Sequence, residues 1–431
     1  MFARHLYSNL LRLLKPAYVL RLWLRGRAEP LYRHAIGERL GAYQGAAQAG
    51  ALWVHAVSLG ETRAAAALVD ALRLRHPQLR LLLTHSTATG REAGKALLRE
   101  GDVQAWLPYD TPGVVDRFFK QFKPVAGVLM ETEIWPNLLH AAHAAGVPMV
   151  LANARLSAKS HRQGQRLSSV MYPAAATLRM ALAQTEDDAT RLRDSGVREV
   201  VVCGNLKFDM TPDPALIARG RAWRARLGRP VVMAAATREG EEALLLAAWA
   251  ALPSAQRPLL LIVPRHPQRF DEVAALVAAQ GLSVARRSSW QAEPGEGAWP
   301  ADVWLGDSMG EMPLYYGMSD VALLGGSFAP LGGQNLIEAA ACGCPVVMGP
   351  HTFNFAEAAT LSLAAGASRR VADMGEGVAQ AVAMAGDAGR GQSAERAVAF
   401  ATQHRGAAER MAEKISALLP DSASVTSPAA G

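Results

Sequence analysis

The sequence predicts an α/β protein built from two Rossmann-like domains. At 431 residues, the chain is too long for one ordinary hydrophobic core. Apolar segments of strand length alternate with helical segments almost throughout, which is typical of a parallel sheet covered by helices. This alternation pauses at the proline-containing stretch 210–214 and then restarts. We therefore expect two domains with a cleft between them.

The expected strands are short apolar segments, most of them separated by helical segments. In the first domain they span residues 52–58, 79–84, 103–107, 125–130, 149–152, 180–184 and 200–203. A turn at Gly60 and a helix over 61–75 follow the first of these strands. In the second domain the expected strands span 231–235, 259–263, 303–305, 321–324 and 345–348. Helices are expected from Gly240 and over 270–280, and a loop over 286–300.

These patterns divide the chain by residue number. Residues 1–40 form an N-terminal helical segment, 41–210 the first domain and 211–418 the second. Residues 419–431 form a Ser-, Ala- and Pro-rich tail that we expect to be disordered. Because open α/β sheets bind ligands beyond the carboxyl ends of their strands, side chains at those ends are the candidates for a site.

The charge and the cysteines limit the class of protein. The net charge of +7 and a sequence pI near 9.5 favour anionic partners, whether nucleic acid, anionic lipid or phosphorylated substrates. Cys203, Cys342 and Cys344 form no CxxC pair and are odd in number. They indicate buried thiols in a reducing compartment rather than a disulfide framework.

The N-terminal 28 residues are basic and rich in leucine. They contain no acidic residue. Lys15 and Arg21 interrupt the apolar run, so an interfacial anchor on an anionic leaflet is favoured over a full membrane span. An ordinary amphipathic helix packed on its own domain is the alternative. Pro16 is expected to kink the helix or to divide it in two.

Glycine-rich turns follow the strand-like segments of 304–354. Such turns let backbone N–H groups approach a phosphate closely. Asn335 and Glu338 are three residues apart, so on a helix they share one face and can grip a single ligand. This stretch resembles the donor half of a nucleotide-sugar glycosyltransferase.

Carboxylates follow two strands of the first domain. Glu61 lies at a strand-to-helix turn, where it can act as a general base towards a hydroxyl or simply stabilise the start of a helix. Glu131 and Glu133 follow the strand 125–130, and alternation puts both on one side if the chain stays extended. Each can contact substrate or cap a helix.

Two cationic side chains also lie beside expected strand ends. Lys207 can neutralise a leaving phosphate or a substrate carboxylate, or it can be solvated. Arg265 follows the strand 259–263 between two prolines and suits bidentate recognition of a phosphate or carboxylate.

Several classes of protein are disfavoured. Residues 236–240 occupy a phosphate-binding position, but neither half contains GxGxxG, which argues against dinucleotide oxidoreduction. Walker A is absent as well. The histidines lack metal-ligand spacing with Asp or Cys, so we expect no metal.

Together these motifs resemble the Kdo transferases, which attach 3-deoxy-D-manno-octulosonic acid (Kdo) to lipid A precursors. The resemblance covers most of the chain up to about residue 360. It is carried, in order, by HAVSLGE at 55–61, METEIWPN at 130–137, NARLS at 153–157, GNLKFD at 204–209, VPRHP at 263–267, GDSMGE at 306–311, the 325–338 segment and GPHTFNF at 349–355.

The resemblance implies a GT-B glycosyltransferase, two Rossmann-like domains facing each other across a deep cleft, with no metal or other cofactor. It implies CMP-Kdo as donor, lipid IVA as acceptor and no nucleic acid. The N-terminal segment would bind anionic lipids on the cytoplasmic side of the inner membrane.

The resemblance also assigns roles to individual residues. It places the catalytic base on Glu61 and transition-state stabilisation on Glu131 and Lys207. Family members often have His where Arg238 and Gln334 stand, which leaves the finer donor contacts open. It places CMP binding on Pro264, Arg265, Met309, Gly310, Glu311, Asn335, Leu336, Ile337 and Glu338.

Two other functions fit parts of the sequence. A nucleotide-sugar epimerase can share the GT-B plan, but it would not need the basic, apolar N-terminus. A catalytically silent membrane-associated binding protein would not need Glu61, Glu131 and Lys207.

Overall fold

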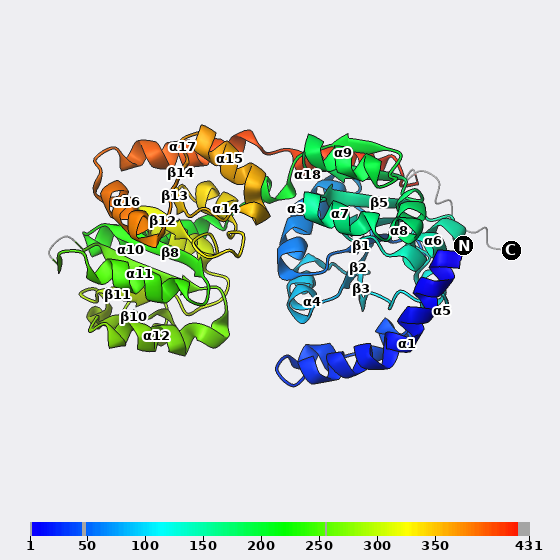
Figure 1. Ribbon diagram of the computed structural model, residues 1–431, viewed down its shortest axis with the longest axis horizontal. Coiled ribbons are helices and arrows are strands. Elements are labelled where there is room, and N and C mark those ends of the chain that lie inside the picture. The colour runs from blue at the N-terminus through cyan, green and yellow to red at the C-terminus, as the bar shows by residue number, and fades with distance from the viewer. Residues whose placement is uncertain (1, 45–48, 255–256, 421–431) are drawn as a thin grey trace. The chain divides into compact units, whose positions relative to one another are not determined.

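The computed structural model describes residues 2–44, 49–254 and 257–420. It divides into two compact units. The first unit runs to Met210 and also includes the chain from Arg405, and the second is Thr211–His404. Each unit contains one parallel sheet and its helices (Figure 1), so the predicted α/β architecture is confirmed.

The sheet of the first unit has the order β3-β2-β1-β4-β5-β6-β7 and is parallel throughout. The chain order reverses between β1 and β4, which are neighbours in the sheet; such a switch point is where doubly wound folds bind ligands. The strands are β1 (Leu52–His55), β2 (Leu81–His85), β3 (Val103–Trp106), β4 (Ala126–Met130), β5 (Met149–Ala154), β6 (Met180–Ala183) and β7 (Val200–Val202).

Both faces of this sheet are packed. Trp53 and Leu82 belong to one buried cluster, whereas Val54 and Leu83 belong to another, because successive side chains of a strand point to opposite faces. The helices are α1 (Phe2–Arg25), α2 (Ile36–Arg39), α3 (Leu59–Arg75), α4 (Ala88–Gly94), α5 (Pro112–Phe122), α6 (Pro136–Ala144), α7 (Ala158–Gln165), α8 (Ser168–Ala175), α9 (Glu186–Asp194) and α18 (Ala407–Ser416).

The second unit repeats the plan with the parallel order β10-β11-β9-β8-β12-β13-β14. Its strands are β8 (Val231–Thr237), β9 (Leu259–Pro264), β10 (Val284–Arg286), β11 (Val303–Leu305), β12 (Val321–Leu324), β13 (Val346–Met348) and β14 (Ser368–Arg370). Its helices are α10 (Pro214–Leu227), α11 (Glu241–Ala250), α12 (Phe270–Ala279), α13 (Met312–Met318), α14 (Leu336–Ala341), α15 (Ala356–Ala364), α16 (Met374–Gly386) and α17 (Arg390–Gln403).

The C-terminal helix corrects one expected boundary. We expected residues up to 418 to belong to the second domain, but α18 lies beside α3 in the first unit (Figure 1). Met411 and Ile415 are buried in the core on that face. The backbone N–H of Ala408 also donates to Asp209 (2.6 Å). Of the expected disordered tail, residues 421–431 lie outside the described residues, while Leu419 packs against the same core.

One expectation about irregular segments was wrong, and another is confirmed. Helix α1 continues through Pro16 and is not divided in two. After Arg286, which ends β10, the segment up to residue 300 is the expected loop, with short 3-10 turns at Arg287–Ser289 and Glu296–Ala298. The rings of Trp290 and Trp299 in this loop both pack against Trp304. Within the described residues, no helix combines the length and the apolarity that crossing a membrane requires.

Candidate active site

Glu61 lies in the first turn of α3, directly beyond the carboxyl end of β1. Ser58 caps this helix, and its hydroxyl donates to Glu61 Oε1 (3.1 Å). The backbone N–H of Val57 donates to Glu61 Oε2 (2.8 Å). These two bonds turn the carboxylate back towards the end of the strand, where doubly wound sheets bind ligands.

The surroundings of Glu61 bring the pKa of its carboxyl group close to neutral pH. Burial raises the pKa of Glu61 to about 7, and the charges of Glu131 and Glu133 act in the same direction. The bonds from Val57 and Ser58 oppose this change only in part. A carboxylate of this pKa can both accept and release a proton at neutral pH, which suits a general base.

Glu131 and Lys207 form an ion pair in the same region. Lys207 Nζ lies 3.4 Å from Glu131 Oε1, and both side chains are about one-fifth exposed. Glu131 directly follows β4 and has the left-handed φ of 58°, an uncommon conformation for a side chain of this size. Lys207 lies on the short 3-10 helix Leu206–Phe208, where Asn205 Oδ1 accepts its backbone N–H (3.0 Å).

Glu133 adds a third carboxylate. Its Oε2 accepts a hydrogen bond from the indole N–H of Trp135 (2.7 Å) and lies 3.9 Å from Nε2 of His55. Burial raises the pKa of Glu133 above its ordinary value, and Glu131 contributes. Burial lowers the pKa of His55 to about 3, so the imidazole is neutral at neutral pH. Sequence reasoning missed His55, because only the fold brings it to Glu133.

The structure therefore brings together the three residues expected to be catalytic. Glu61, Glu131 and Lys207 all lie at the carboxyl edge of the first sheet, on segments that follow β1, β4 and β7. The charges of Glu131 and Glu133 act on Glu61 and raise its pKa. Such an arrangement keeps a carboxylate basic and suits proton abstraction from a neutral hydroxyl.

In the second unit, the candidate donor residues also follow strands. Pro264 ends β9, and the backbone N–H of the next residue, Arg265, donates to Thr237 at the end of β8 (3.0 Å). Gly310 has the left-handed φ of 82°, and Met309 is 63% exposed.

Glu311 is engaged in contacts within the unit. Its Oε1 pairs with Arg219 (2.7 Å) and Arg287 (2.8 Å), and its Oε2 accepts from the hydroxyl of Ser308 (2.6 Å). Burial alone would raise the pKa of Glu311, but the Ser308 bond and the two arginines bring it below its ordinary value. This carboxylate is therefore placed to shape the turn around it.

Helix α14 presents its residues in two different ways. Asn335 caps the helix, since its side chain accepts the N–H of Ile337 (3.2 Å). Leu336 and Ile337 are each 1% exposed, so only their backbone could reach a ligand. Asn335 and Glu338 are both partly exposed. Asn335 precedes the helix as its cap, and Glu338 lies in the first turn.

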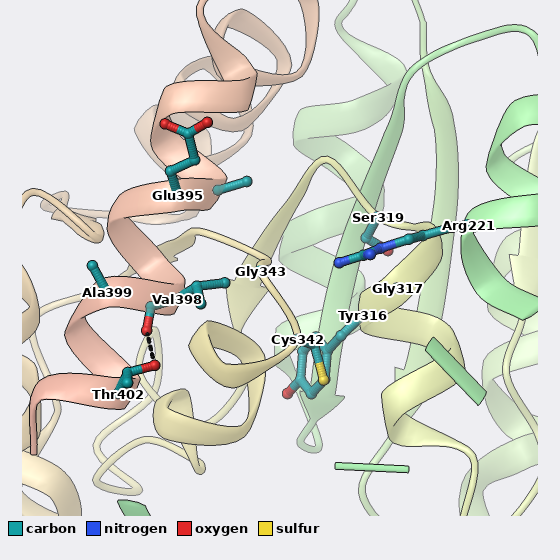
Figure 2. A pocket seen from close by; sticks show the side chains of 11 residues that line it. Arg221, Tyr316, Gly317, Ser319, Cys342, Gly343, Glu395, Val398, Ala399 and Thr402 are labelled. Carbon is teal, nitrogen blue, oxygen red and sulfur yellow. Dashed lines mark hydrogen bonds between the residues drawn. The ribbon is translucent and has the colours of Figure 1, made fainter. Parts of the chain in front are cut away.

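A pocket of about 540 Å³ lies elsewhere in the second unit (Figure 2). Glu395, Val398 and Thr402 of α17 line one side of it. Ser319 and Gly343, which also line it, precede β12 and β13, whereas the glycine-rich turns follow those strands. The pocket is therefore at the opposite end of the sheet from the candidate donor residues.

The fold and the site define a class of protein. Two Rossmann-like units, each built on a parallel sheet, are the GT-B architecture. The structure is similar to that of HepE from Anabaena in complex with UDP, with a TM-score of 0.57 over 86% of this chain and 100% of that chain. The sequence identity is 16%, so this likeness concerns the fold alone.

Sequence relatives identify the family. Residues 34–210 match the family model described as 3-deoxy-D-manno-octulosonic-acid transferase (kdotransferase). The chain is 48% identical to the 3-deoxy-D-manno-octulosonic acid transferase of Bordetella pertussis over 94% of its own length and 97% of that protein's. It is 37% identical to the enzyme of the same name from Haemophilus influenzae, over 82% and 84% of the two lengths. The chain belongs to the Kdo transferase family.

Proposed function

We propose that the protein transfers Kdo from CMP-Kdo to lipid IVA with inversion at the anomeric carbon, at the cytoplasmic face of the inner membrane. The observation that carries the proposal is the Glu61 carboxylate, with a pKa of about 7, beside the Glu131–Lys207 ion pair. Family membership supports Kdo as the transferred sugar.

In the proposed reaction, Glu61 accepts the proton of an acceptor hydroxyl. The hydroxyl oxygen attacks the anomeric carbon of Kdo, and the bond from that carbon to the phosphate oxygen of CMP breaks. CMP leaves with the bonding electron pair, and Glu61 later releases its proton to water. The hydrogen bonds from Val57 and Ser58 hold the carboxylate in one orientation for this step.

The leaving CMP gains negative charge in the transition state. Lys207 would supply a positive charge at the carboxyl edge of the first sheet. Arg265 and the glycine-rich turns of the second unit would hold the phosphate. Interactions that strengthen as charge develops lower the barrier, whereas equally strong binding of substrate and transition state does not.

A lipid acceptor gives α1 a role. One side of this helix packs on the first unit, where the hydroxyl of Tyr7 donates to Asp110 (2.9 Å) and that of Ser8 to Asn137 (3.0 Å). Phe2, Leu13 and Leu20 are instead 82%, 79% and 56% exposed. Exposed apolar side chains between basic ones are typical of a helix that lies in a membrane interface.

The test is to incubate the purified full chain with CMP-Kdo and lipid IVA, and to weigh the lipid products by mass spectrometry. The proposal predicts addition of whole Kdo residues and release of CMP only when the lipid is present. Release of CMP without any lipid product would favour the epimerase or a hydrolase instead. The 48% identity to a Kdo transferase favours transfer over epimerisation.

A further inference from the structure

Glu241 lies at the carboxyl edge of the second sheet. Its carboxylate is buried, and the proposed mechanism does not use it. It is the first residue of α11, just after the turn that follows β8. Glu241 is 1% exposed. In the part of the chain that the structure describes, no Lys or Arg forms an ion pair with it. A buried charge of this kind persists only where hydrogen bonds replace its hydration.

Backbone N–H groups supply those hydrogen bonds. Glu241 Oε2 accepts from the N–H groups of Gly326 (2.7 Å) and Arg238 (2.9 Å). Glu241 Oε1 accepts from those of Phe328 (3.2 Å) and Ala329 (3.3 Å). A carboxylate offers about four acceptor positions, so all of them are occupied. One N–H group belongs to the turn after β8, and the other three belong to the turn after β12.

The two turns that Glu241 joins are in direct contact. Gly325, at the start of the turn after β12, lies against the end of β8. A Cβ atom on Gly325 would be 2.3 Å from the carbonyl oxygen of Ala236. Only glycine fits there, and the backbones meet without intervening side chains.

Ser327 extends the connection to a third turn. Its Oγ accepts the N–H of Gly349 (2.9 Å), and its carbonyl accepts that of His351 (3.0 Å). Strands β8, β12 and β13 are neighbours in the sheet. The turns at their carboxyl ends are therefore one hydrogen-bonded unit with Glu241 near its centre.

We propose that Glu241 is a positioning residue of the donor site, which fixes the 325–329 turn before the nucleotide binds. The inference rests on the proposed function, since it assumes that this turn meets CMP. Glu241 does not itself touch the ligand, because its acceptor positions are occupied. A turn held in its bound shape loses less conformational entropy on binding, and this raises affinity.

The matched pair of variants is Glu241→Gln and Glu242→Gln. Glutamine at 241 turns one acceptor oxygen into an N–H donor that faces two backbone N–H groups. Glu242 is also buried and lies on the same helical turn, but it bonds to the hydroxyl of Thr237 (2.8 Å) and to Arg269 (2.7 Å). It serves as a control for the loss of a buried carboxylate.

Calorimetric titration of the full-length variants with CMP measures the effect. We expect Glu241→Gln to weaken CMP binding at least about tenfold, and to raise KM for CMP-Kdo by a similar factor with little change in the KM of the lipid. Glu242→Gln should lower the melting temperature but keep CMP affinity within about twofold. A folded Glu241→Gln variant with the CMP affinity of the wild type overturns the inference.

Hydrogen exchange on the wild-type protein tests the same point without a variant. The amides of Gly326, Phe328 and Ala329 should be protected before CMP is added. Protection that develops only with CMP would contradict a preformed turn. If the wild type does not bind CMP at all, the proposed function fails instead, so the two failures are distinguishable.

Discussion

Lys207 Nζ lies 3.4 Å from Glu131 Oε1, at the carboxyl edge of the first sheet. The two residues are far apart in sequence and follow strands β7 and β4. Their pairing neutralises one of the acidic groups around Glu61. The pair can therefore set the local charge that Glu61 experiences.

The pH dependence of kcat/KM should report the protonation of Glu61. The base acts only when it is ionised, and burial raises its pKa to about 7. Activity should therefore be lost as the pH falls below about 7 and should reach a plateau above it. A profile of kcat/KM from pH 5 to 9 at constant ionic strength measures this loss of activity, which is the acid limb of the profile. A limb near pH 4 would mean that an ordinary exposed carboxylate controls the rate.

Replacing Lys207 by Met should have two separate effects. The loss of a charge that stabilises the transition state should lower kcat by about 10²–10³-fold. The limb of the pH profile should also move to higher pH, because removing a cation raises the pKa of neighbouring carboxylic acids. Lys207→Arg keeps the charge and is the control, with the limb unmoved. If Lys207→Met loses activity at the same pH as the wild type, the ion pair does not influence the pKa of Glu61.

The exposed side of α1 should control binding to membranes. The double substitution Leu13→Glu and Leu20→Glu should lower partitioning into vesicles of anionic phospholipid at least about tenfold, since it removes apolar area and adds like charge. Leu74→Glu is the control, because Leu74 is 83% exposed on α3. Flotation assays at low and high salt measure the effect, and binding of the wild type should weaken with salt. Equal flotation of the two variants would argue against the role proposed for α1.

The sequence identified most of the strands, because buried parallel strands are continuous apolar runs. It missed the edge strands β10 and β14, which have three residues each. The residues of β10 are only partly buried, and two of the three in β14 are exposed arginines, so neither strand is a buried apolar run. The helix α18 was assigned to the second domain by chain order, although its apolar side is buried in the first unit. Nothing local marks where a C-terminal helix returns.

The candidate site was predicted to a similar extent. Glu61, Glu131 and Lys207 are marked by their place after apolar segments, and the structure brings them together. Glu241 was missed because three of its four partners lie 85 or more residues along the chain. His55 was missed because its partner Glu133 is brought near only by the pairing of β1 with β4.

The central claim is that Glu61 is the base for transfer. The decisive measurement is the single-turnover rate of Glu61→Gln with CMP-Kdo and lipid IVA, followed by mass spectrometry of the lipid. Glutamine keeps the size of the side chain and removes its basicity. We predict a rate about 10²–10⁴-fold below that of the wild type, with CMP binding unchanged. A rate near that of the wild type would contradict the account.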